Sequence, residues 1–169
     1  TNTPNIKLII IFTFGVILMR SAGCIINDIA DQHIDRQVKR TKQRPLANNN
    51  LTPQQAYIFC SILLTICLGL VLSLNHLCLI LSIIGLMLTC LYPFCKRLLN
   101  MPQGILGITF AWGILMAYAA IQNQISPQGL TLYIATIFWV IGYDTQYAMV
   151  DRDDDLKIGV RSSAILFGQ

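Results

Sequence analysis

The acidic residues of this 169-residue chain are all aspartates, and they fall in two short stretches: Asp28, Asp31, Asp35, Asp144, Asp151, Asp153, Asp154 and Asp155. On an α-helix, residues three, four and seven apart share one face. Asn27, Asp28, Asp31 and Asp35 therefore form one stripe, and Asp144, Tyr147, Asp151 and Asp155 form another. Carboxylates one helical turn apart repel each other, so both stripes favour a positively charged ligand.

Hard divalent cations suit such stripes, because they take oxygen ligands and can bridge to phosphate oxygens. Two opposed stripes would hold a diphosphate through Mg2+. The alternative interpretation is that these aspartates are solvated loop residues, but the confinement of every acid to two periodic clusters argues against it. A calcium loop over DRDDDLKIG is excluded, because its sixth position is Leu156 rather than Gly and no Glu closes it.

The elements that must position these stripes are apolar. Hydrophobic residues make up 54% of the chain and charged residues 12%, and the mean hydropathy is +0.59. Five apolar stretches approach the ~20 residues that a helix needs to cross a bilayer. Backbone groups in lipid must hydrogen-bond within the segment, which favours helices. We therefore predict an all-α polytopic transmembrane bundle in one membrane-embedded domain, with spans at 7–26, 55–74, 77–95, 103–121 and 130–150.

The basic residues predict the orientation. Ten of the twelve Lys and Arg lie in 36–44, 96–97 and 152–161, after alternate spans. The positive-inside rule places these segments, and both aspartate stripes, on the cytoplasmic side. The net charge of +4 then reports orientation rather than a nucleic-acid partner. The chain starts at Thr1 just before a span and stops at Gln169 as another apolar stretch begins, so we expect a domain incomplete at both ends.

Two charged residues lie deeper than the stripes. Arg20 precedes Asn27 by seven residues, on the same face and about 10 Å further along the helix. A charge inside a span usually faces a cavity or a partner, and a guanidinium there could bind a carboxylate through two hydrogen bonds. Snorkelling towards the interface is the alternative. Asp144 lies about 10 Å deeper than Asp151, where an acceptor or a cation would sit; otherwise it is a polar residue at a helix end.

Cysteine and histidine chemistry is not indicated. None of the six cysteines forms a C-x-x-C pair, so they are interpreted as small core residues. His33 lies off the aspartate stripe and His76 lies in a turn, and both are interpreted as surface histidines.

The stretch NDIADQHIDRQVKRTKQRPL resembles the N-D-x-x-D-x-x-x-D…R-T-x-x-R-P-L signature of the UbiA superfamily of intramembrane prenyltransferases. The stretch YDTQYAMVDRDDDLKIGVRSSAILFG resembles the second aspartate-rich motif of that superfamily, most closely in the 4-hydroxybenzoate polyprenyltransferases of ubiquinone biosynthesis. LMRSAGC and LYPFCKR also fit, so the resemblance runs over essentially the whole chain. It implies a ring of nine transmembrane helices around a cavity capped on the cytoplasmic side, of which the five spans would be helices two to six.

The resemblance also implies roles for individual residues. Arg44 and Lys96 would neutralise phosphate oxygens, with Tyr92 and Lys96 as the family's Y-x-x-x-K pair. Taken without the family, Lys96 and the basic run at 36–44 are interpreted as anchors on the positively charged side of the membrane, and Arg36, Lys39 and Lys42 stay interpreted as surface charges. Arg20 would bind the carboxylate of the acceptor, Asp144 would lie near the allylic cation, and Asp28 would support the metal ligands. The ligands of Mg2+ would be Asn27, Asp31, Asp35, Asp151 and Asp155.

The implied reaction transfers a polyprenyl group from polyprenyl diphosphate to 4-hydroxybenzoate, ortho to its hydroxyl, in the bacterial inner membrane, with no protein partner. Haem-farnesylating and homogentisate- or dihydroxynaphthoate-prenylating enzymes stay open as alternatives. A CDP-alcohol phosphotransferase is disfavoured because the chain has no Asp-Gly pair. A cation transporter is disfavoured because the acids lie at helix ends rather than at the midplane.

Overall fold

The computed structural model describes residues 5–159 and 161–168, apart from the side chains at positions 96, 97, 154 and 158. This part of the chain is helical and contains no strand, which confirms the predicted all-α class. Its helices are α1 (Ile6–Asp35), α2 (Pro53–Leu72), α3 (His76–Leu98), α4 (Gln103–Gln122), α5 (Pro127–Ile158) and α6 (Ser163–Leu166).

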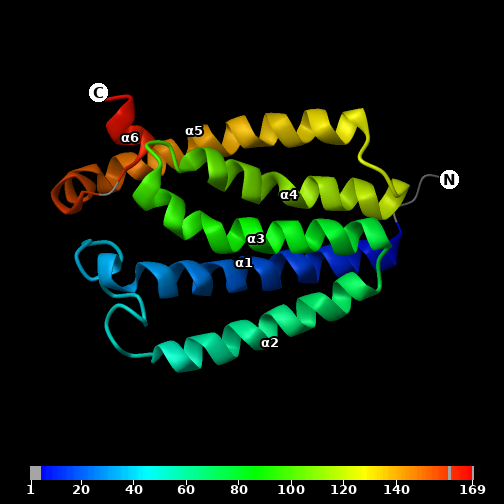
Figure 1. Ribbon diagram of the computed structural model, residues 1–169, viewed down its shortest axis with the longest axis horizontal. Coiled ribbons are helices and arrows are strands. Elements are labelled where there is room, and N and C mark those ends of the chain that lie inside the picture. Colours follow the sequence, from blue (N-terminus) through cyan, green and yellow to red (C-terminus); the bar gives the residue numbers. More distant parts are fainter. Residues whose placement is uncertain (1–4, 160, 169) are drawn as a thin grey trace.

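The first five helices lie along the long axis of the molecule and alternate in direction (Figure 1). The loop between α1 and α2, the connection from α3 to α4 and the end of α5 with α6 all gather at one end of the bundle. Short connections at the opposite end join α2 to α3 and α4 to α5. Both aspartate motifs therefore lie at the same end, as the sequence predicts.

Polar residues cap the starts of α2, α3 and α5. Thr52 caps α2, because its side chain accepts a hydrogen bond from Gln55 N while the Gln55 side chain accepts one from Thr52 N. Asn75 and Ser126 cap α3 and α5 by accepting a hydrogen bond from a backbone N–H of the first turn. These caps satisfy backbone donors that a helix leaves unpaired at its start.

Four helices, α1 to α4, are long and apolar enough to cross a membrane. The fifth predicted span, 130–150, lies inside α5, which does not reach the same apolar composition within the described residues. Asp144, Thr145 and Gln146 interrupt its apolar sequence. At 1.5 Å per residue, the 30 residues of α1 and the 32 of α5 extend about 45 and 48 Å.

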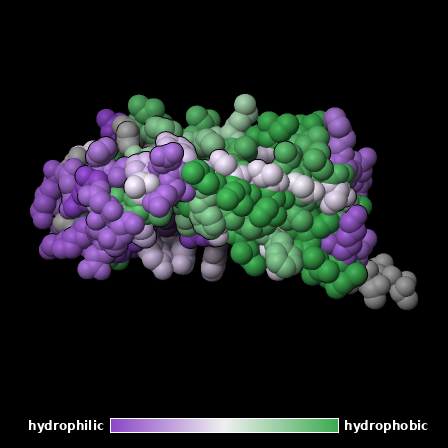
Figure 2. Space-filling view, turned by 90° about the horizontal axis from the view of Figure 1, so that it is seen from below, coloured by the Kyte–Doolittle hydropathy of each residue, from purple (hydrophilic) through white to green (hydrophobic). Residues whose placement is uncertain are grey.

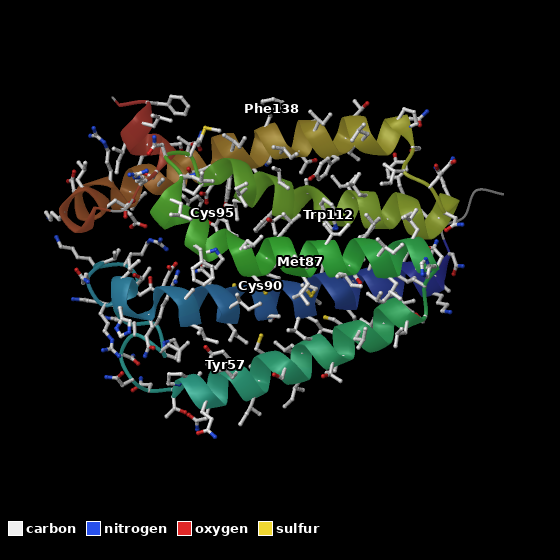
Figure 3. The ribbon with its side chains drawn as sticks, viewed as in Figure 1. Tyr57, Met87, Cys90, Cys95, Trp112 and Phe138 are labelled. Atoms are coloured by element: carbon white, nitrogen blue, oxygen red, sulfur yellow. The ribbon has the colours of Figure 1, made fainter. Side chains whose placement is uncertain are left out.

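The bundle is held together by α4, which packs between α3 and α5. Gly107 makes this packing close: a Cβ atom there would lie 2.9 Å from the carbonyl oxygen of Ile137 on α5. Trp112 lies between α4 and α3 (Figure 3) and donates a hydrogen bond of 2.8 Å to the Leu81 carbonyl. On the other side, α1 packs against α2 and α3, with Ala22 buried beside α2. The two helices that carry the aspartates are thus connected through α3 and α4.

The surface matches a membrane setting. Apolar side chains cover the middle of the bundle, whereas polar residues gather most densely at the end with the aspartate motifs (Figure 2). Large apolar side chains such as Ile17 on α1, Phe59 on α2 and Trp139 on α5 are exposed. Exposed apolar side chains on a helix that is long enough to span a bilayer are expected to face lipid.

Candidate active site

Both aspartate motifs line one pocket of about 160 Å3 at the polar end of the bundle. Its wall contains five aspartates and three arginines, Asp31, Asp35, Asp144, Asp151, Asp155, Arg40, Arg44 and Arg161, so these charged residues leave an excess of two negative charges. Tyr92 and Gln103 also contribute to it. The structure therefore brings together most of the residues that the sequence singled out.

Two aspartates of the first motif are almost completely buried on α1. Asp31 is 3% exposed and Asp35 is 6% exposed. Buried carboxylates are costly unless they are paired, and Asp35 is paired with Arg44. Nη1 of Arg44 lies 2.9 Å from Oδ2 of Asp35 and 2.8 Å from Oδ1 of Asp28. Arg44 thus lies among the predicted site residues, and its guanidinium contacts both Asp28 and Asp35.

The second motif is connected to the first by Arg40, in the loop after α1. Its guanidinium donates to both carboxylate oxygens of Asp151, with Nε 3.1 Å from each oxygen and Nη2 2.6 Å from Oδ2. These hydrogen bonds raise the pKa of Arg40 above its ordinary value. A charged guanidinium in this bidentate arrangement fixes the loop against α5.

The loop between α1 and α2 is also fastened to the end of α1. Gln32 donates to the Leu46 carbonyl at 3.1 Å, and Arg36 donates to the Ala47 carbonyl at 3.0 Å. Thr41 donates to the carbonyl of Asp35 at 3.2 Å. Arg36, which the sequence analysis treats as part of a surface run, is exposed but serves as an anchor for this loop.

The opposite wall of the pocket is fixed by the segment that follows α5. The backbone N–H of Ser163 donates to the side-chain oxygen of Gln103 at 3.1 Å, and Ser163 shares a hydrogen bond of 2.6 Å with Thr145. Arg161 donates to the Leu98 carbonyl at 3.1 Å. These contacts hold the start of α4, the end of α5 and α6 together around the pocket.

The donor set of the pocket fits a hard divalent cation, because four carboxylates from two helices, Asp31, Asp35, Asp151 and Asp155, reach one small polar space. Among the described side chains, no group of three or more His, Cys, Asp or Glu is arranged closely enough to hold a metal ion. Arg44 and Arg40 occupy oxygens of Asp35 and Asp151 in this arrangement. The carboxylates would therefore have to exchange arginine for metal.

Of the remaining predicted residues, two line the pocket and the others do not, or lie outside the described side chains. Asp144 and Tyr92 line the pocket. Asn27 is half-buried on α1 but does not line it. Lys96 lies outside the described side chains. Arg20 does not line the pocket either; it is exposed on α1, where its guanidinium carbon lies 5.4 Å from the centroid of the Phe110 ring on α4.

Sequence reasoning missed Arg40 and Arg161. Both lie in connections rather than on a helical stripe, so periodicity cannot place them. Arg40 is the first arginine of the R-T-x-x-R-P-L segment, which was the one signal available for it. Nothing in the spacing of Arg161 distinguishes it from other basic residues on the polar side.

Comparisons with known proteins point to one family. The family model described as the UbiA prenyltransferase family matches residues 1–169. Proteins named 4-hydroxybenzoate octaprenyltransferase from Shewanella sp. (strain MR-4) and Aliivibrio salmonicida (strain LFI1238) are each 51% identical to this chain over 166 residues. These alignments cover 98% of this chain but 58% of each relative, so the chain spans a little over half their length.

Solved structures show the same arrangement of helices. The apo structure of a UbiA homolog from Aeropyrum pernix K1 has a TM-score of 0.84 and 29% sequence identity, and the match covers 98% of this chain and 63% of that one. A structure of digeranylgeranylglyceryl phosphate synthase in membranes has a TM-score of 0.74 and 26% identity, covering 98% and 58%. With its four membrane-capable helices, the chain is an integral membrane protein.

Proposed function

This chain belongs to the UbiA prenyltransferase family, and on that premise we propose that the protein transfers a polyprenyl group from polyprenyl diphosphate to 4-hydroxybenzoate in ubiquinone biosynthesis. The attachment is ortho to the hydroxyl, because the para position already carries the carboxylate. The observation that carries the proposal is the single pocket lined by both aspartate motifs. The names of the bacterial relatives support the choice of acceptor.

The carboxylates of the pocket hold the diphosphate end of the donor through Mg2+. Asp31 and Asp35 from α1 face Asp151 and Asp155 from α5, with Asn27 as a further oxygen ligand on the first motif. Bound there, the metal supplies positive charge for the leaving diphosphate. Arg44 and Tyr92 line the pocket. In this proposal Arg44 donates hydrogen bonds to the remaining phosphate oxygens, and Lys96, whose side chain lies outside the described part of the structure, has the same role.

The chemistry is an electrophilic aromatic substitution. The carbon–oxygen bond between the prenyl group and the diphosphate breaks, and its electron pair leaves with the diphosphate. A ring carbon of the acceptor then bonds to the allylic cation, and the proton on that carbon is lost to restore aromaticity. Asp144 lines the pocket and precedes Asp151 by seven residues on α5, about 10 Å along the helix. Its negative charge there favours the cation, and Arg20 binds the acceptor carboxylate.

The membrane orientation is part of the proposal. The basic segments and both aspartate motifs face the cytoplasm, and the protein lies in the bacterial inner membrane. The prenyl chain then occupies the apolar interior while its diphosphate sits at the polar end of the bundle. This arrangement agrees with the distribution of polar residues in Figure 2.

The test is magnesium-dependent transfer by the full-length parent protein in membranes, measured as prenylated 4-hydroxybenzoate. Asp31→Asn and Asp151→Asn should each lower the rate at least about 100-fold, the size of effect seen when a charge-stabilising group is removed. Asp153→Asn, an exposed aspartate of the same segment that does not line the pocket, should leave the rate unchanged. Full activity in either of the first two variants would contradict the metal assignment.

The acceptor is tested separately by offering homogentisate, dihydroxynaphthoate and haem in place of 4-hydroxybenzoate. Efficient transfer to one of these, with none to 4-hydroxybenzoate, would keep the prenyltransferase activity and overturn the acceptor.

A further inference from the structure

Arg20 lies at the middle of α1, fourteen residues after Ile6 and fifteen before Asp35. At 1.5 Å per residue this leaves about 21 Å of helix on either side. A charge at the centre of a membrane-spanning helix is costly and calls for a partner. Within the described part of the chain, the guanidinium of Arg20 makes no hydrogen bond or ion pair. It makes a cation–π contact with the ring of Phe110.

The contact with Phe110 restrains the guanidinium without using its donors. The ring face attracts the positive charge, and the carbon of the guanidinium lies 5.4 Å from the ring centroid. The five N–H donors stay available, and they form a rigid fork that matches a carboxylate. An aspartate in place of Phe110 would neutralise the charge and occupy that fork.

The place of this pair in the bundle leaves it open to a ligand. Arg20 is on α1 and Phe110 is on α4, two helices that touch each other little and are both packed against α3. Phe110 is 53% exposed and Arg20 is exposed. Phe110 belongs to α4, the helix that packs between α3 and α5, yet it is not a member of either buried cluster.

We propose that Phe110 is a positioning residue for the acceptor: it holds the guanidinium of Arg20 in the orientation that receives the carboxylate of an aromatic acid. The inference rests on the proposed function and adds a specificity-determining residue to it. Phe110 acts through Arg20, so its effect is confined to acceptors that carry a carboxylate.

The experiment compares Phe110→Leu with the wild type in the full-length parent protein, using 4-hydroxybenzoate and, as a second acceptor, a phenol that lacks the carboxylate. We expect the KM for 4-hydroxybenzoate to rise about 5- to 30-fold, the range between an exposed and a desolvated cation–π contact, while kcat changes less than about 2-fold. The KM for the phenol should not change. Phe110→Trp, which keeps an aromatic face, should restore most of the affinity.

The matched control is Phe138→Leu. Phe138 is an exposed phenylalanine (69%) on α5 and points away from the other helices (Figure 3). This variant should leave both KM values unchanged. The thermal midpoint of each purified variant shows that it folds, and equilibrium dialysis with radiolabelled 4-hydroxybenzoate measures binding without the donor.

A double substitution gives the decisive outcome. If Phe110 acts through Arg20, Phe110→Leu has no further effect on KM in an Arg20→Met background. An equal rise in both backgrounds, or an unchanged KM in a folded Phe110→Leu variant, would overturn this inference while the proposed function stands. A wild-type protein that neither binds nor prenylates 4-hydroxybenzoate would overturn the proposed function, and this inference with it.

Discussion

The polar pocket and the middle of the bundle differ in how their charged side chains are paired. In the pocket, Asp35 is bound by Arg44 and Asp151 is bound by Arg40. Half a helix away, Arg20 lies in an apolar setting against an aromatic ring. The pocket can keep its charges balanced within the chain because acidic and basic segments converge there. The middle of the bundle offers no acid among the described residues near Arg20.

In the proposed reaction this difference separates two tasks. The pocket would accept a highly charged group and release it again, with its carboxylates exchanging arginine for metal. The middle of the bundle would select the acceptor, because a cation with unused donors discriminates strongly against a ligand that lacks the matching acid. Substitutions in the two regions should therefore affect different quantities.

The largest effect is expected in the pocket. Asp35→Asn removes one of the two carboxylates that Arg44 contacts and takes a charged ligand from the proposed metal site. We expect activity to fall about 100- to 1,000-fold, and the free energy of unfolding to fall by about 1–3 kcal/mol because a buried charge-assisted hydrogen bond is lost. Activity assays and denaturation of the purified protein measure the two effects. Loss of activity with unchanged stability would show that Arg44 finds another partner.

Arg20→Met should act in the opposite sense on stability. The kcat/KM for 4-hydroxybenzoate should fall about 10- to 100-fold, as expected when a hydrogen-bonded charge pair with the substrate is lost. The thermal midpoint should stay the same or rise, because a charged side chain at the centre of a spanning helix is replaced by an apolar one. Metal-dependent binding of the diphosphate should be unchanged. A clear fall in the midpoint would mean that Arg20 is structural, and the contrast between the two regions would fail.

Arg40→Gln is expected to have the smallest effect on stability, and the direction of its effect on metal affinity shows whether Arg40 competes with the metal. Arg40 is half-exposed, so the loss of its ion pair should cost about 1 kcal/mol or less. Asp151 would then lose its bound cation, and Mn2+ should bind a few-fold more tightly in the absence of diphosphate, by the direct competition of two positive ligands for one carboxylate. Electron paramagnetic resonance of Mn2+ measures this, with Lys42→Gln as the control. Weaker binding would mean that Arg40 helps to build the metal site.

Much of the fold could be predicted, because hydrophobic length and polar breaks are local properties. The starts of α2, α3 and α5 follow from Thr52, Asn75 and Ser126, and the end of α5 follows from Gly159, whose φ of 73° suits glycine. The aspartate stripes were predictable because their residues share helices. The exception is α5, which within the described residues is less apolar than α1 to α4.

The contacts of the site could not be predicted from spacing. Arg40 reaches Asp151 across 111 positions of sequence, and Phe110 meets Arg20 across two helices that share α3. Long side chains that leave a loop, or a ring on a neighbouring helix, carry no periodic signal. Their positions depend on how the helices pack, which is a property of the whole chain.

The lengths of α1 and α5 relate the protein to the lipid around it. Both helices exceed the hydrocarbon core of a typical bilayer, which is about 30 Å thick. They must therefore tilt or project, and hydrophobic mismatch sets how far the acidic end stands above the acyl chains. A thicker membrane would draw that end towards the headgroups. Turnover in vesicles of short- and long-chain phosphatidylcholine should consequently differ, and identical rates would show that the helices adjust by tilting alone.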